Sequence, residues 1–107
     1  MYKRQVLNSQ LKKGLKSIKK INDIIIAYEP VWSIGTGLIP SSDELSKSIK
    51  FIKSKFRKKS PKVLYGGSVN SKNIDQLKII PDIDGFLIGG ASQNPKKFID
   101  IIKKTIN

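Results

Sequence analysis

The sequence contains no cysteine and no histidine. Without cysteine, a disulfide framework, a thiolate zinc site and a cysteine nucleophile are excluded within this chain. Without histidine, no imidazole is present to bind a metal ion or to transfer a proton near neutral pH. Any chemistry within these 107 residues must therefore use carboxylates, lysines, hydroxyl groups and backbone amides.

Long apolar runs are also missing. No stretch approaches the ~20 apolar residues of a membrane-spanning helix, and residues 1–6 lack the apolar core of a signal peptide. We therefore expect a cytoplasmic chain that does not engage a membrane. The length corresponds to about one domain, and a hydrophobic content of 38% is that of a globular protein.

Acidic residues are scarce. The sequence has 8 Asp and Glu residues and 21 Lys and Arg residues, which gives a net charge of +13. Such an excess raises nucleic acid as a partner. Only two of the basic residues are arginine, however, and no run interleaves aromatic with basic residues as single-strand binders do. In residues 42–59 the lysines fill the helical faces left free by Leu45, Ile49, Ile52 and Phe56, which is typical of a solvated surface. Nucleic acid is therefore the less favoured partner.

Helical and strand-like patterns alternate along the chain. Apolar residues recur at helical spacing in residues 2–20, 42–59, 71–77 and 95–106. Apolar runs rich in β-branched residues predict buried strands at residues 24–28, 62–65 and 83–88. Ser41 and Glu44 form a capping-box pattern, Ser71 is expected to cap the third helix, and Pro95 suits the first turn of the last. This order predicts an α/β fold with a parallel sheet and right-handed crossovers.

Each predicted strand ends in a glycine-rich loop, and the carboxyl ends of parallel strands are where such folds bind ligands. Glu29 stands at the first of these ends, where it is either a general base or an ordinary strand-end carboxylate paired with lysine. Residues 30–40 contain the only tryptophan and are interpreted as a lid. Gly-Gly pairs at 66–67 and 89–90 precede predicted helices, and backbone amides at such starts attract phosphate.

Three segments resemble the active-site loops of the triosephosphate isomerase family, in the same order and at similar spacing. They are AYEPVWSIGTG at residues 27–37, YGGSV at 65–69 and DGFLIGGAS at 84–92. The resemblance implies a (β/α)₈ TIM barrel. The chain would form one partial domain over residues 1–107, made of the last three βα units preceded by one helix. It also implies interconversion of dihydroxyacetone phosphate and D-glyceraldehyde 3-phosphate, a step of glycolysis and gluconeogenesis, without a metal or cofactor.

The resemblance assigns a role to each loop. Glu29 would be the base that moves a proton between adjacent substrate carbons through an enediolate. The groups that would hold the substrate phosphate, chiefly through backbone amides, are Gly35, Ser68, Gly89 and Gly90. Lys53 stands where the family usually has an arginine, and its expected partner is Asp82.

A whole barrel needs ~250 residues, so the chain would hold about two fifths of one. We expect the first five strands to be missing, with the family's substrate-binding Asn and Lys, its electrophilic His and most of its homodimer interface. Two unpaired sheet edges and one uncovered face would leave the chain marginally stable, prone to associate and without appreciable turnover. Two alternatives are a remnant of a split gene that needs an N-terminal complementing fragment, and a basic half-barrel that binds phosphate or nucleic acid.

Overall fold

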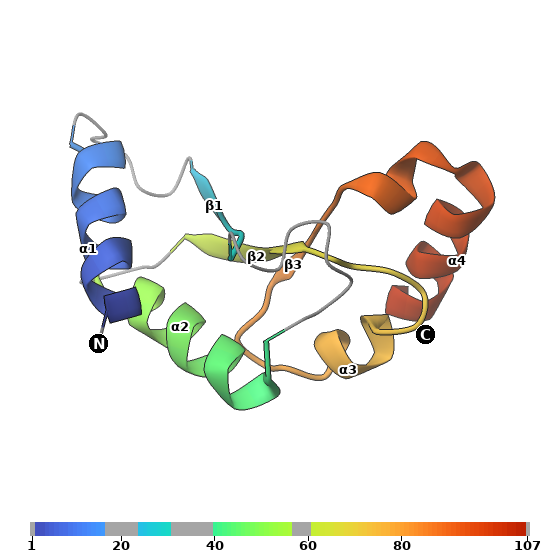
Figure 1. The fold of residues 1–107 in the computed structure, drawn as a ribbon, viewed down its shortest axis with the longest axis horizontal. Helices are drawn as coiled ribbons and strands as arrows, with labels where there is room; N and C mark the ends of the chain where they lie inside the picture. Colours follow the sequence, from blue (N-terminus) through green and yellow to red (C-terminus); the bar gives the residue numbers. More distant parts are fainter. Residues whose placement is uncertain (1, 17–23, 31–39, 57–60, 107) are drawn as a thin grey trace.

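The computed structural model describes residues 2–16, 24–30, 40–56 and 61–106 (Figure 1). The elements in chain order are α1 (Tyr2–Gly14), β1 (Ile25–Tyr28), α2 (Ser42–Ser54), β2 (Lys62–Gly67), α3 (Ile74–Lys78), β3 (Gly85–Ile88), the short 3₁₀ helix η3 (Gly90–Gln93) and α4 (Pro95–Ile106). The predicted alternation of helices and strands is confirmed. Within the described ranges, none of the helices has the length and apolar character that crossing a membrane requires.

The three strands form one parallel sheet in the order β1-β2-β3. Tyr28 of β1 pairs with Tyr65 of β2, and Gly66 of β2 pairs with Leu87 of β3. In Figure 1 the sheet lies at the centre, with α1 and α2 on one side of the view and α3 and α4 on the other. Because the strands are parallel, their carboxyl ends all lie at one edge of the sheet.

One face of the sheet carries the core. Val63 and Tyr65 of β2 are fully buried there. Val63 packs with Ile49 and Ile52 of α2, and Tyr65 clusters with Leu45, which begins the apolar stripe of that helix. These residues follow the helical spacing seen in the sequence, and α2 covers this face of the sheet with them.

The opposite face of the sheet, called the bare face below, is not covered by any of the described helices. Side chains alternate between the two faces of a strand, so Ile25, Leu64 and Leu87 point away from the core helices. Ile25 is 66% exposed and Leu87 is 49% exposed. The described part of the chain thus has the uncovered apolar face that the sequence predicts.

Both ends of α2 are defined by hydrogen bonds. At its start, the Ser41 hydroxyl accepts from the Glu44 backbone N–H at 3.2 Å, which confirms the predicted cap. The helix ends at Ser54, and not at residue 59 as predicted. Lys55 donates its N–H to Ile52 O, and Phe56 donates to Lys53 O, both at 3.2 Å. These shorter-range bonds tighten the last turn and end the helix.

The start of α3 is set by asparagine and not by serine. The Asn70 side-chain oxygen accepts from the backbone N–H groups of Lys72 and Asn73, at 2.9 and 3.0 Å. The Asn73 side chain in turn accepts from Asn70 N–H at 2.9 Å. These bonds hold residues 70–73 in a turn, so the helix begins at Ile74 and the prediction of Ser71 as its cap is wrong.

Asp84 joins three elements at the start of β3. Its carboxylate accepts from Val63 N–H of β2 at 2.9 Å and lies 3.0 Å from Lys53 Nζ of α2. The predicted pair of Lys53 with Asp82 is therefore wrong. Asp82 instead accepts from the Ser46 hydroxyl at 2.8 Å and lies 3.9 Å from Lys50 Nζ.

The charge state of Asp84 follows from these contacts. Partial burial opposes its ionisation, but the Val63 N–H, the Lys53 ammonium and the charge of Lys62 together outweigh that cost and lower the pKa of Asp84 below its ordinary value. Since this pKa is lower in the folded chain, the stabilisation is complete above the pKa of the unfolded carboxyl. It is lost as the pH falls through the folded value.

We predict that Asp84→Asn lowers the free energy of unfolding at pH 7 by about 1 kcal/mol, the usual size of one hydrogen bond. The variant should also flatten the loss of stability below pH 4. Urea titrations between pH 7 and pH 2.5 measure both effects. In double-mutant cycles, Lys53→Gln should couple to Asp84→Asn by about 0.5 kcal/mol. Equal coupling to Asp82→Asn would contradict the assigned pair.

We predict that the bare face mediates self-association. Replacing Ile25 with Thr and Leu87 with Gln should weaken association roughly tenfold, because apolar area leaves the contact. Sedimentation velocity at fixed ionic strength measures the change. Ile106→Gln is the control, because Ile106 is exposed but lies at the end of α4. An equal effect of the control would assign the association to the helices.

Candidate active site

Glu29 follows the last residue of β1 and its side chain lies beside Gly66 of β2. A Cβ on Gly66 would stand 3.6 Å from Glu29 Cβ and Oε1, and 3.5 Å from Leu87 Cβ. Gly66 therefore sits between Glu29 and Leu87, at the carboxyl ends of all three strands. Glu29 is exposed while Gly66 is buried, so the carboxylate covers the glycine from the solvent side.

A cavity of about 470 Å³ opens next to this point, between the loop after β2 and the start of α4. Ser68 and Gly90, two of the residues singled out in the sequence, both line it. The described residues that complete its lining are Gly67, Val69, Asn70, Ser71, Lys72, Ala91, Lys97 and Ile101. No carboxylate is among these, whereas two lysines are, so the cavity suits an anion.

The loop after β2 is held in shape by its own hydrogen bonds. β2 continues through Gly66 and Gly67, which the sequence analysis assigns to the loop, and Gly67 has a φ of 152° that favours glycine. Val69 N–H donates to Gly67 O at 3.0 Å, and the buried Val69 side chain anchors the turn in the core. The Asn73 side chain donates to Ser68 O, which fixes the backbone of Ser68.

The loop after β3 is built around the carbonyl of Gly89, which accepts from both the N–H and the hydroxyl of Ser92. A Cβ added at Gly89 or at Gly90 would meet no atom within 4 Å, so both backbones are open to a ligand. Gly89 precedes Gly90 but does not line the cavity. The bonds to Ser92 hold the two glycines where η3 begins.

The structure brings together some of the expected site residues. Ser68 and Gly90 share one cavity, and Glu29 reaches the same end of the sheet through its contact with Gly66. Gly35 and residues 31–39 of the expected lid lie outside the described residues. Lys72 and Lys97 were not singled out by the sequence analysis. They line one cavity because the loop before α3 and the first turn of α4 meet there, although the two lysines are 25 positions apart and no local pattern marks them.

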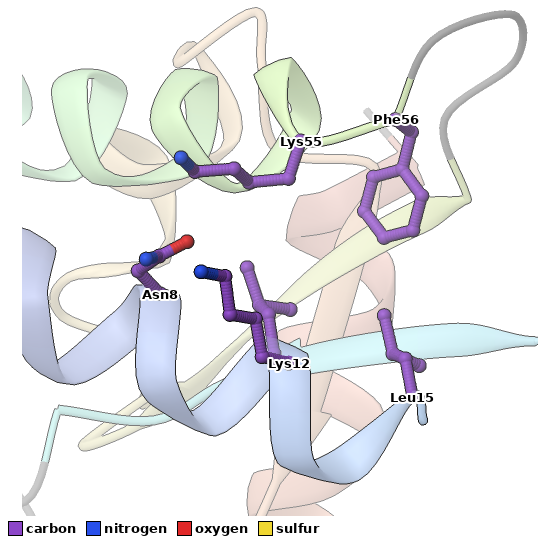
Figure 2. A pocket seen from close by; sticks show the side chains of 6 residues that line it. Asn8, Lys12, Leu15, Lys55 and Phe56 are labelled. Atoms are coloured by element: carbon purple, nitrogen blue, oxygen red, sulfur yellow. The ribbon is translucent and has the colours of Figure 1, made fainter. Parts of the chain in front are cut away.

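A second cleft, of about 300 Å³, lies between α1 and the end of α2. Figure 2 shows the polar ends of Asn8, Lys12 and Lys55 on one side of it, with Phe56 and Leu15 on the other. Because α2 runs back toward the start of β2, this cleft lies at the opposite end of the sheet from Glu29. None of Glu29, Ser68, Gly89 and Gly90, the expected site residues within the described ranges, lines it.

Metal-binding groups do not gather in the described part of the chain. Within residues 2–16, 24–30, 40–56 and 61–106, no three acidic side chains lie close enough together to hold an ion. The described residues at the strand ends instead offer a carboxylate, hydroxyl groups, lysines and backbone amides.

Comparison with known proteins identifies the family. The family model described as triosephosphate isomerase matches residues 2–105. Among named relatives, the triosephosphate isomerase of Mycoplasma mobile is 45% identical over 100 residues, which cover 94% of this chain and 41% of the relative. That of Synechocystis is 42% identical, over 92% of this chain and 40% of the relative. The chain thus spans about two fifths of the length of these relatives, and the resemblance stated from its three loops is confirmed.

We predict that position 66 tolerates an alanine side chain but not the larger side chain of valine. Gly66→Ala places its Cβ at ordinary contact distance from Glu29 and Leu87 and should leave stability unchanged within about 0.5 kcal/mol. Gly66→Val should cost about 1–3 kcal/mol, because its extra methyl groups overlap Glu29 or Leu87. Urea titration and the ¹³C shift of the Glu29 carboxyl measure both effects. Equal tolerance of Val would show that Glu29 does not pack beside this glycine.

Proposed function

Because the chain belongs to the triosephosphate isomerase family, in which its three parallel strands and flanking helices form part of a TIM barrel, we propose that it carries the catalytic base and the phosphate-binding loops of that enzyme. The reaction is the interconversion of dihydroxyacetone phosphate and D-glyceraldehyde 3-phosphate. One observation supports the proposal above others: a carboxylate and an anion-suited cavity both lie at the carboxyl ends of the same strands.

In the proposed reaction the Glu29 carboxylate removes a proton from one substrate carbon. The electron pair of the broken C–H bond forms an enediolate. A proton passes from the hydroxyl oxygen on the first carbon to the former carbonyl oxygen, and Glu29 returns a proton to the adjacent carbon, so that the hydroxyl carbon becomes the new carbonyl. A general base must lie within hydrogen-bond reach of the proton that it takes. The exposed position of Glu29 over Gly66 suits this role, because nothing in the described chain covers the carboxylate from the open side.

The substrate phosphate is proposed to bind in the cavity through Ser68 and the backbone amide of Gly90. Gly89, whose backbone is also open, would contribute its amide from the edge of the cavity. Gly35, in the expected lid, would contribute a further amide. Binding of the phosphate fixes the position of the reacting carbons relative to Glu29. The phosphate does not react itself, and its binding energy offsets the entropy lost when the substrate is oriented. The proposed chemistry uses only protein groups and needs no metal or cofactor.

We propose that turnover requires a second polypeptide segment. The chain corresponds to about two fifths of its relatives' length, and β1 and β3 each pair on only one side among the described strands. A segment that supplies the remaining strands would pair with these edges, cover the bare face and add the group that polarises the substrate carbonyl. The assembled enzyme would be a cytoplasmic homodimer, as expected from the family, and this chain alone would show no appreciable turnover.

The test is reconstitution with a polypeptide that carries the first five βα units of the Mycoplasma mobile relative. We expect the mixture to interconvert the two triose phosphates and the isolated chain to be inactive. Glu29→Gln should lower the rate about 10²–10⁴-fold, the usual contribution of a general base. Asp100→Asn is the matched control, because Asp100 lies on α4 and pairs with Lys104 at 3.6 Å, away from the strand ends.

Two results would contradict separate parts of the proposal. A reconstituted Glu29→Gln variant with normal turnover would remove Glu29 from the chemistry. Turnover by the purified chain at the rate of the mixture would show that no second segment is needed. Size-exclusion chromatography of each mixture shows whether a loss of rate reflects lost assembly and not lost chemistry.

A further inference from the structure

The cavity between the loop after β2 and the start of α4 has lysines on two separate elements. Lys72 belongs to the loop between β2 and α3, and Lys97 belongs to the first turn of α4. Both line the same cavity as Ser68 and Gly90, and no acidic side chain stands among its described lining residues. The two lysines therefore add positive charge to the site from two different elements.

The backbone of each lysine is fixed by a neighbouring asparagine. Lys72 N–H donates to the Asn70 side-chain oxygen at 2.9 Å, and Lys97 N–H donates to that of Asn94 at 3.1 Å. These hydrogen bonds fix the backbone position from which each lysine side chain extends. Among ion pairs between described residues, the lysine partners are Lys50, Lys53, Lys78 and Lys104. Neither cavity lysine is engaged in one of them.

The position of Lys97 is unfavourable for the helix itself. The first turn of α4 contains Lys96 and Lys97 and no acidic residue. The amino end of a helix carries partial positive charge, so lysines there are repelled and acidic residues are favoured. By contrast, α2 places Asp43 and Glu44 in its first turn. Residues that destabilise a helix are expected at positions where a binding site requires them. A bound anion would relieve the repulsion between these lysines and the amino end of α4.

We propose that Lys72 and Lys97 together neutralise the two negative charges of the substrate phosphate, and so make the cavity selective for a phosphate dianion. This inference rests on the proposed function and specifies which side chains recognise the substrate. The backbone amides and Ser68 supply directed hydrogen bonds to the phosphate oxygens, and the lysines supply the charge.

The test is an NMR titration of the ¹⁵N-labelled 107-residue chain with inorganic phosphate, at pH 8 and constant ionic strength. The amides of Ser68 and Gly90 report binding in the cavity. Lys72→Gln and Lys97→Gln should each weaken phosphate binding about 3- to 10-fold, as loss of one exposed charge partner implies. The double variant should weaken binding at least about tenfold, and Lys97→Arg should retain most of the affinity because the charge is kept.

Two lysines elsewhere serve as matched controls. Lys103 lies in the last turn of α4, and Lys12 lines the other cleft. A chain of charge +13 attracts any anion through its overall field, and removal of one charge anywhere weakens that attraction slightly. Lys103→Gln and Lys12→Gln should therefore change the affinity less than about twofold.

The outcomes separate this inference from the proposed function. If the cavity variants weaken binding no more than the controls do, while phosphate still shifts Ser68 and Gly90, the phosphate site stands and the role of the lysines is wrong. If phosphate shifts neither amide in the unmodified chain, both the phosphate site and the inference are wrong. Equal binding of acetate in the cavity would overturn the selectivity for a dianion.

Discussion

The parallel pairing of β2 with β1 on one side and with β3 on the other determines where Glu29 and the loops after β2 and β3 lie. Because Tyr28 pairs with Tyr65, Glu29 comes to stand beside Gly66, and because Gly66 pairs with Leu87, the loops after β2 and β3 begin at the same level. A shift of one residue between β1 and β2 would turn Glu29 toward the core helices, and a shift of one residue between β2 and β3 would displace the two loops relative to each other. The burial of Val63 and Tyr65 under α2 and its neighbours opposes such a shift.

The order and type of the α-helices and strands could be predicted from the sequence, because the helices have apolar residues at helical spacing and the strands are apolar runs rich in β-branched residues. The short helix η3 was not predicted. The ends of the elements were less predictable. Side-chain hydrogen bonds from Asn70 and Asn73 decide where α3 begins, and such bonds compete with helical ones over only a few residues. The choice of Asp84 over Asp82 as the partner of Lys53 depends on the position of β3 against β2, which no local pattern contains.

Some residues of the candidate site could be predicted from the sequence and others could not. Glu29, Ser68 and Gly90 could be singled out because they lie within motifs that resemble a known family, and the structure gathers them at one end of the sheet. Lys72 and Lys97 could not be singled out, since lysine is so frequent in this chain that its presence at one position carries little information. Only the folded arrangement shows that these two share a cavity.

The bare face of the sheet places the chain under two opposing forces in water. Apolar attraction between exposed isoleucine and leucine side chains acts over contact distances, whereas repulsion between copies that each carry a charge of +13 acts over the Debye length. That length is about 30 Å in dilute buffer and about 8 Å at physiological ionic strength. We therefore expect repulsion between copies to keep the chain monomeric in dilute buffer. At higher ionic strength this repulsion is screened, and the exposed apolar face can bring two copies together.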